Sequence, residues 1–69
     1  MENRFAEQLK SLREEVGLTR AQLAEKMNVS VRLVGYWEKG QRECDFDMLI
    51  KIAELFSCTL DYLLGRKDY

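Results

Sequence analysis

Apolar residues recur at helical spacing along most of the chain, and the first such group lies near the N-terminus. Its members follow one another at intervals of four, three and four residues: Phe5, Leu9, Leu12 and Val16. Side chains three and four positions apart lie on the same side of an α-helix. The spacing therefore predicts a first helix over about residues 2 to 15 that buries these four side chains and ends near Gly17.

Residues 19–40 contain two shorter helical patterns with a tight turn between them. Thr19 is a suitable N-cap for the first pattern, and Gln22 completes a capping-box sequence three residues later. One face of this helix then carries its apolar residues, namely Leu23, Ala24 and Met27. Asn28 follows, and asparagine accepts the left-handed backbone that reverses a chain at modest cost. We therefore predict a helix that starts at about Arg20 and ends at Asn28.

The second helix of this pair has a packing side and a polar side. Ser30 is a suitable N-cap, and Gly40 terminates the helix. Around the helical axis, one half holds Ser30, Leu33, Val34, Trp37 and Glu38. The other half holds Arg32, Gly35, Tyr36 and Lys39. A glycine inside a helix costs about 0.5 to 1 kcal/mol relative to alanine, so Gly35 indicates a place where another molecule approaches the backbone closely.

Two more helices are predicted in the C-terminal third of the chain. Asp45 caps the first of them, which ends near Ser57 and has a buried face made of Leu49, Ile52, Ala53 and Phe56. Thr59 caps a short fifth helix, Leu60 to Leu64, which Gly65 closes.

The whole pattern predicts an all-α fold, a compact five-helix bundle. No strand pattern and no proline interrupts it. With 69 residues in all, we expect one domain over residues 1–65 and a short C-terminal tail over residues 66–69. A domain of this size has a marginal core, so association with a second subunit is plausible from length alone.

Several short motifs follow one another in a specific order over about residues 5 to 65. They are Leu-Thr, Leu-Ala, Val-Ser, Trp-Glu-x-Gly and Leu-Leu-Gly. In this order the chain resembles the helix-turn-helix family of the Cro and lambda-repressor type, also called the XRE family. The resemblance implies the lambda-repressor-like bundle, sequence-specific binding to DNA, and dimer contacts at the C-terminal end of the domain.

The net charge of -1 at first argues against a nucleic-acid partner. The charges are unevenly distributed, however. Residues 20–42 contain five basic and two acidic residues, whereas residues 43–69 contain three basic and six acidic ones. The positive excess therefore coincides with the predicted helix pair. On charge alone, an ordinary solvated mixture of charges explains the sequence equally well.

Residue types that carry chemistry are scarce. The chain has no histidine and two distant cysteines, Cys44 and Cys58, so we expect no metal site, no cofactor and no enzymatic activity. Cys58 resembles a small core residue, while an exposed Cys44 thiol acting as a redox switch is a weaker hypothesis. The sequence contains no apolar run long enough for a membrane span and no secretory signal, which favours a cytoplasmic protein. We also expect no small-molecule substrate.

The polar side of the second helix of the pair supplies the candidate base contacts. Arg32 can donate two hydrogen bonds to guanine, and Tyr36 combines a hydroxyl with apolar contact. Val31 is suited to a thymine methyl group. The resemblance implies that base contacts come from the positions of Ser30, Val31, Arg32 and Tyr36, with Gly35 between them. The alternative is that Arg32 contacts only phosphate and that Tyr36 covers part of Trp37.

Candidate phosphate contacts flank both helices of the pair: Thr19, Arg20, Lys39, Gln41 and Arg42. Arg20 stands where similar proteins often have a glutamine that binds phosphate, and an arginine adds a charge-assisted hydrogen bond there. The alternative for these polar residues is that they only keep the protein soluble, which is the role we expect for Lys10 and Lys26.

Two further groups are expected to be structural. Arg13 and Glu38 lie beside apolar helix faces and resemble the partly buried ion pair that ties the first helix to the recognition helix in phage repressors. Trp37 is expected in the core. A self-complementary dimer interface is predicted from Ile50, Leu60, Tyr62, Leu63 and Tyr69, with the alternative that Leu60 and Leu63 simply complete the monomer core.

These features favour a sequence-specific transcriptional regulator, and more narrowly a repressor that binds a pseudo-palindromic operator in double-stranded DNA as a homodimer. Its output would depend on its concentration, on dimerisation or on an antagonist protein. The alternative is a protein-interaction module, such as an antitoxin-like protein or an adaptor, with weak DNA binding.

Overall fold

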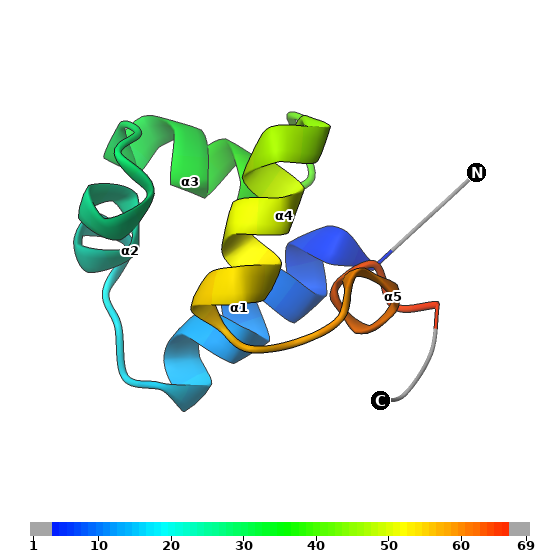
Figure 1. Ribbon diagram of the computed structural model, residues 1–69. Helices are drawn as coiled ribbons and strands as arrows, with labels where there is room; N and C mark the ends of the chain where they lie inside the picture. The colour runs from blue at the N-terminus through cyan, green and yellow to red at the C-terminus, as the bar shows by residue number, and fades with distance from the viewer. Residues whose placement is uncertain (1–3, 67–69) are drawn as a thin grey trace.

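The computed structural model describes residues 4–66, which form five helices and no strand. The helices are α1 (Phe5–Glu15), α2 (Arg20–Met27), α3 (Val31–Glu38), α4 (Phe46–Leu55) and α5 (Leu60–Leu63). In Figure 1, α2 and α3 lie together at the left of the molecule, while α5 lies beside the start of α1 at the right. The predicted all-α bundle and its five helices are therefore confirmed.

Local sequence signals define most helix starts. The side chains of Thr19, Ser30, Asp45 and Thr59 each accept a hydrogen bond from the backbone N–H three residues later, so each caps a helix as predicted. The first helix is shorter at its N-terminal end than its apolar spacing suggested, because Arg4 has a non-helical backbone and α1 begins at Phe5.

The core is formed by one apolar face from every helix. Its fully buried large side chains are Leu9, Leu23, Met27, Val34, Trp37, Ile52 and Leu63. Trp37 is therefore a core residue, as predicted. Val16 is not, because α1 ends before it and its side chain is 58% exposed. Phe56 is half-buried and packs against the edge of the core.

A backbone and a side-chain hydrogen bond join the two ends of the described chain. The Arg4 N–H donates to the Leu64 carbonyl at 2.9 Å, and Gln8 Nε2 donates to the Tyr62 carbonyl at 3.0 Å. Gly65 has a φ of +75°, and a Cβ atom at this position would lie 2.5 Å from Arg4 Cβ. The close approach of α5 to α1 therefore requires glycine at position 65.

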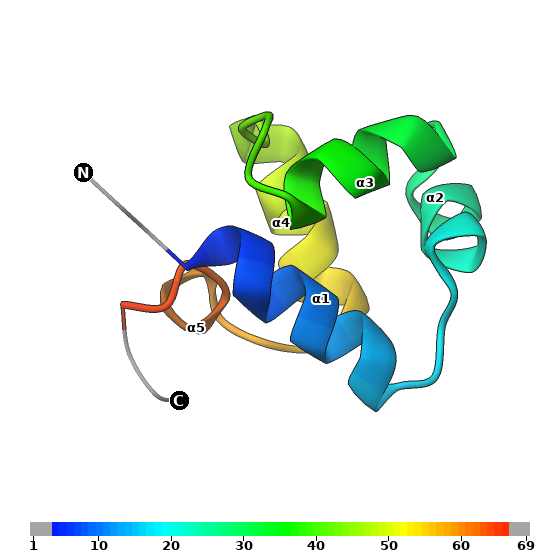
Figure 2. The ribbon, with the colours of Figure 1, turned by 180° about the vertical axis from the view of Figure 1, so that it is seen from behind.

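Figure 2 shows the bundle from behind, with α1 crossing below α3. Helix α3 packs against both α1 and α2, and α2 also packs against α4. One long side of α3 therefore faces the bundle, and the opposite side is left on the surface. Within residues 4–66, no helix is long and apolar enough to cross a membrane.

Candidate nucleic-acid interface

Capping hydrogen bonds start α2 and α3, and the chain turns between the two helices at Asn28. The Gln22 N–H donates to Thr19 Oγ1 at 3.1 Å, and the Thr19 N–H donates to Gln22 Oε1 at 2.8 Å, which completes the predicted capping box. Asn28 has the left-handed backbone predicted for it, with φ 59° and ψ 44°. Ser30 Oγ then accepts from the Leu33 N–H at 3.1 Å and starts α3 two residues after that turn. These contacts fix the direction of α3 relative to α2.

Helix α3 has the two sides that its sequence predicts. Val34, Trp37 and Glu38 are buried. Val31 and Arg32 are exposed at its start, and Gly35 and Tyr36 are half-buried on the outer side. A Cβ atom at Gly35 would meet nothing within 4 Å, so packing among the described residues does not require glycine there. The outer side is thus open to another molecule along its length.

A buried carboxylate ties three helices together at the inner side of α3. Glu38 Oε2 accepts from Arg13 Nε at 2.6 Å, and Glu38 Oε1 accepts from Arg13 Nη2 at 3.2 Å. Arg13 also donates through Nη1 to the Leu18 carbonyl at 2.8 Å. The hydrogen bond to Glu38 raises the pKa of Arg13, which outweighs the opposing effect of burial. The predicted ion pair is therefore present, and it anchors the loop before α2 as well as α3.

A third residue, Arg20, joins the ion pair of Arg13 and Glu38, and the sequence did not predict this contact. Arg20 Nε donates to Glu38 Oε1 at 3.1 Å, although the sequence suggested only a phosphate contact for this arginine. Glu38 has a fully buried side chain, whereas that of Arg20 is 40% exposed. No periodicity or motif links residues 20 and 38, because the contact depends on how α2 crosses α3.

A second contact crosses the outer surface of α3. The guanidinium carbon of Arg42 lies 5.8 Å from the centroid of the Tyr36 ring, within the range of a cation–π interaction. The side chain that covers the Tyr36 ring is therefore that of Arg42. Lys39, Gln41 and Arg42 are all exposed at the C-terminal end of α3.

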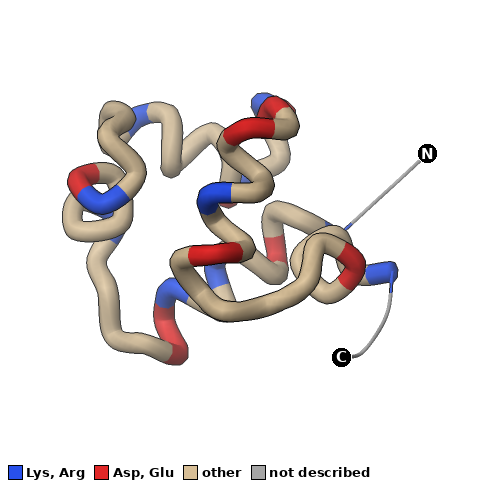
Figure 3. The backbone as a smooth tube through the Cα atoms, viewed as in Figure 1, with Lys and Arg blue, Asp and Glu red and all other residues tan. Residues whose placement is uncertain are grey.

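Charged residues are arranged around this surface much as the sequence suggested. Figure 3 shows basic residues on α2, on α3 and in the loop after α3, together with acidic residues on α2 and in that loop. Acidic residues lie on α4 and α5, including Asp47 and Asp61 in their first turns. The outer side of α3 therefore combines exposed cations with hydrogen-bonding groups. Such a surface is typical of contact with phosphates and base edges.

Comparison with known proteins decides the family. A family model described as "Helix-turn-helix" matches residues 9–63. The chain belongs to the XRE-type helix-turn-helix family. It is 34% identical over 64 residues to the HTH-type transcriptional regulator ImmR of Bacillus subtilis, an alignment that covers 93% of this chain and 50% of that protein. The chain spans about half the length of the first curated relatives that it matches.

Solved structures agree with this family and with its fold. A transcriptional regulator from Listeria innocua has a TM-score of 0.89 and 38% identity, with coverage of 94% of this chain and 61% of that one. The P22 c2 repressor, solved in complex with a synthetic operator, has a TM-score of 0.84 and 24% identity, with coverage of 91% and 96%. The bundle is therefore the lambda-repressor-like helix-turn-helix fold, in which α2 and α3 are the two helices of the motif.

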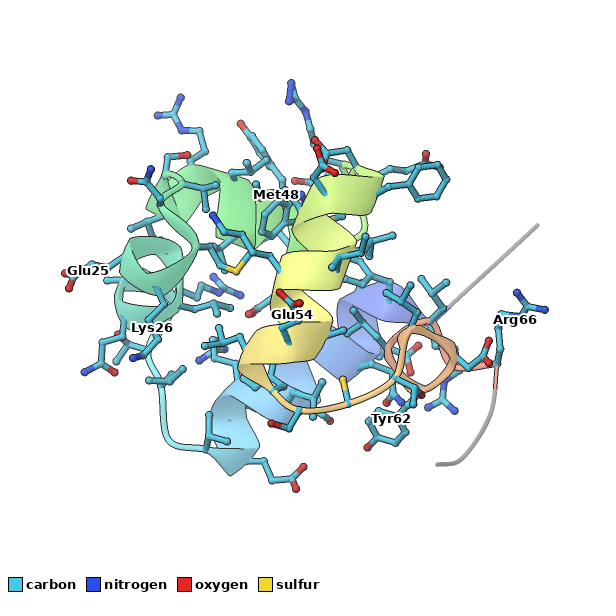
Figure 4. The ribbon with its side chains drawn as sticks, viewed as in Figure 1. Glu25, Lys26, Met48, Glu54, Tyr62 and Arg66 are labelled. Atoms are coloured by element: carbon cyan, nitrogen blue, oxygen red, sulfur yellow. The ribbon has the colours of Figure 1, made fainter. Side chains whose placement is uncertain are left out.

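The family's dimer region was expected at the other end of this helix-turn-helix domain. Ile50 and Leu60 are 47% and 41% exposed, and the half-buried Tyr62 points outward from α5 in Figure 4. Leu63 is fully buried in the monomer core, so its prediction as an interface residue is wrong. Its side chain completes the core, which is the alternative that the sequence left open. Tyr69 lies outside the described residues.

Both cysteines of this helix-turn-helix domain are at least partly buried. Cys44 is half-buried, and burial, together with the neighbouring Asp45 carboxylate, raises its pKa to about 12. Burial also raises the pKa of the Cys58 thiol, which packs against the core as predicted. The weaker hypothesis of an exposed Cys44 thiol that acts as a redox switch is therefore not supported, because the residue is half-buried and its pKa is raised. Among residues 4–66, no cluster of acidic or cysteine side chains is placed to hold a metal ion.

Proposed function

We propose that this helix-turn-helix domain binds double-stranded DNA sequence-specifically as a homodimer, and that it represses transcription from promoters that contain a pseudo-palindromic operator. The observation that carries the proposal is the outer side of α3. It exposes Arg32, Lys39 and Arg42 beside an open Gly35, while the inner side is occupied by the core. Membership of a family whose relatives are transcriptional regulators supports the same function.

Five residues are proposed to contact bases: Ser30, Val31, Arg32, Gly35 and Tyr36. Arg32 suits bidentate hydrogen bonding to guanine O6 and N7, and Val31 suits a thymine methyl group. Ser30 Oγ already accepts from the Leu33 N–H, so its hydroxyl proton remains available for an acceptor on a base edge. Gly35 allows the backbone of α3 to approach the groove, and the Tyr36 hydroxyl extends the contact along the helix.

The phosphate contacts are proposed for Thr19, Arg20, Lys39, Gln41 and Arg42, which flank α3 from both ends. Each neutralised phosphate contributes about -0.9 to the slope of log affinity against log salt concentration, so binding should weaken steeply as salt rises. In a two-fold dimer the two α3 helices would enter successive major grooves about 34 Å apart. An antagonist protein that captures the dimer is one proposed means of control.

A selection of bound sequences from a random duplex pool tests this proposal. The full chain and its Arg32→Ala variant are compared at about 150 mM salt, because specificity has meaning only at a defined salt concentration. Lys26→Ala is the matched control, since Lys26 points outward from α2 in Figure 4 and was assigned no DNA contact. An inverted repeat that is recovered by wild type and Lys26→Ala but relaxed in Arg32→Ala supports a dimeric, sequence-specific protein. Failure of wild type to enrich any sequence contradicts it.

A second candidate function is a protein-interaction module with weak DNA affinity. One observation favours it: Phe46 at the start of α4 is 83% exposed, which is unusual for so large an apolar side chain. Under this function, a partner would remain bound to the variant that combines Arg20→Ala with Arg32→Ala, but would be lost from Phe46→Ala. Wild type would then also fail to retain DNA at low salt.

A further inference from the structure

We propose that the buried Glu38 controls the contact between Arg20 and a DNA phosphate, as a positioning residue that does not touch DNA itself. This inference rests on the proposed function of α3 and assigns a second role to a carboxylate that otherwise has only a structural one. It also predicts that the Arg20 guanidinium group binds Glu38 through one edge and a DNA phosphate through another.

The network contains two guanidinium groups and two carboxylates, because Glu14 Oε2 also lies 4.0 Å from Arg13 Nη2, with a side chain that is 58% exposed. The Glu38 carboxylate, on α3, faces two guanidinium groups, one from Arg13 on α1 and one from Arg20 at the start of α2. Arg13 occupies both carboxylate oxygens, at 2.6 and 3.2 Å, and its side chain is only 11% exposed. Arg20 adds a single hydrogen bond from Nε, at 3.1 Å. Arg20 is therefore the arginine of this network that reaches solvent, and one hydrogen bond holds it to the buried carboxylate.

The geometry of a guanidinium group makes this single hydrogen bond directional. Arginine is planar and carries its five N–H donors in a fixed fork. When Nε is held by Glu38, rotation of the plane is restricted, and the edge formed by the two Nη groups is not the edge that binds the carboxylate. Among residues 4–66, neither Nη atom of Arg20 has a hydrogen-bond partner. The free edge of Arg20 is thus already oriented to bind a phosphate oxygen.

A fixed orientation of the Arg20 side chain increases affinity, because a long and freely rotating side chain loses rotamer freedom when it binds. Glu38 imposes much of that restriction before DNA arrives, and the anchor itself is rigid because its side chain is fully buried. Lysine at position 20 would keep the charge, but its three rotatable donors on one nitrogen lack the planar fork that fixes one edge toward Glu38 and another toward phosphate. The comparison of arginine with lysine therefore separates positioning from charge alone.

The experiment measures the affinity of the full chain for a duplex recovered in the selection, over about 50 to 200 mM salt. Arg20→Gln should lower the log–log salt slope by about 0.9 for each subunit bound and weaken binding about tenfold. Arg20→Lys should keep the slope and still weaken binding several-fold. Lys26→Gln, an exposed charge deletion on the same helix, should change neither quantity. Thermal melting of each variant confirms that the domain is folded.

The role of Glu38 is then tested by its dependence on Arg20. Glu38→Gln, which keeps the size and an acceptor, should weaken DNA binding in the wild-type background but not further in Arg20→Gln. If Glu38→Gln does not fold, the comparison of Arg20→Lys with wild type carries the test. Equal affinity of Arg20→Lys and wild type, or an unchanged salt slope in Arg20→Gln, would overturn the inference while leaving DNA binding intact. Absence of DNA binding by wild type would instead overturn the proposed function, and this inference with it.

Discussion

The side chain of Glu38 links α3 to both α1 and α2. Its fully buried carboxylate accepts three N–H donors from arginines on α1 and α2, so both of its oxygens are hydrogen-bonded. A buried charge is tolerated only when such partners offset its lost hydration. The sequence predicted the contact with Arg13 from a family resemblance, but not the contact with Arg20. That contact depends on a helix crossing, which no local pattern encodes.

Replacement of Glu38 by alanine should therefore destabilise the fold before it changes DNA specificity. Removing one partner of a buried ion pair costs about 3 to 5 kcal/mol, because Arg13 would remain buried without its counter-charge. Urea unfolding monitored by Trp37 fluorescence measures the loss. Glu25→Ala is the control, since Glu25 points into solvent from α2 in Figure 4 and its removal should change stability by no more than about 0.5 kcal/mol. Equal unfolding midpoints for the two variants would contradict this interpretation of Glu38.

The reactivity of the Cys44 thiol can also be tested at the level of a single residue. A pKa raised to about 12 leaves almost no thiolate at pH 8.5, and the thiolate is the nucleophile. In the native Cys58→Ser variant, iodoacetamide should therefore alkylate Cys44 much more slowly than in the same variant unfolded in urea. The native rate should rise with pH well beyond the point at which the unfolded rate has levelled off. Native and unfolded rates that match at pH 8.5 would show an accessible, reactive thiol instead.

At the level of elements, the chain could be predicted well because its helices are defined by local signals. Each N-cap contact lies within three residues, and the capping box at Thr19 was readable from two side chains. The end of α1 was less certain, because apolar spacing continued to Val16 after the helical backbone had stopped. A residue just beyond a helix can match the periodicity of the core without facing it. Helix existence thus follows from sequence, whereas burial at a helix end depends on the next loop.

Asn28 controls the turn that orients α3 against α2. Its φ of 59° lies in the left-handed region, which costs most L-residues about 1 to 2 kcal/mol but is open to glycine. Asn28→Ala should therefore lower the free energy of unfolding by roughly that amount, while Asn28→Gly should leave it nearly unchanged. Chemical denaturation of both variants measures the difference. Equal losses would mean that the asparagine side chain, and not its backbone, holds the turn.

On the scale of the whole molecule, sequence could not decide which apolar residues remain outside the core. Leu60 and Leu63 lie on the same short helix, yet one is 41% exposed and the other is fully buried. Phe46, at the start of α4, is 83% exposed although it is a large apolar residue. These outcomes depend on how α5 docks on α1 and α4, and the contact with α1 joins residues that are distant in sequence. The candidate DNA-contacting surface was more predictable, because one helix carries most of it.

The proposed dimer interface can be tested by placing a charge on one exposed apolar residue at a time. Leu60→Glu should convert a dimer into a monomer in sedimentation experiments, because an unpaired carboxylate in an apolar interface is costly to desolvate. It should preserve the monomer fold, and Ile50→Glu should act similarly. Val16→Glu is the matched control, since Val16 is 58% exposed at the far end of α1 and should leave the dimer intact. Leu63→Ala should instead lower the stability of the fold by about 2 to 5 kcal/mol, as expected for a core leucine. If Leu60→Glu and Ile50→Glu both remain dimeric, the two subunits of the protein must meet through a different surface.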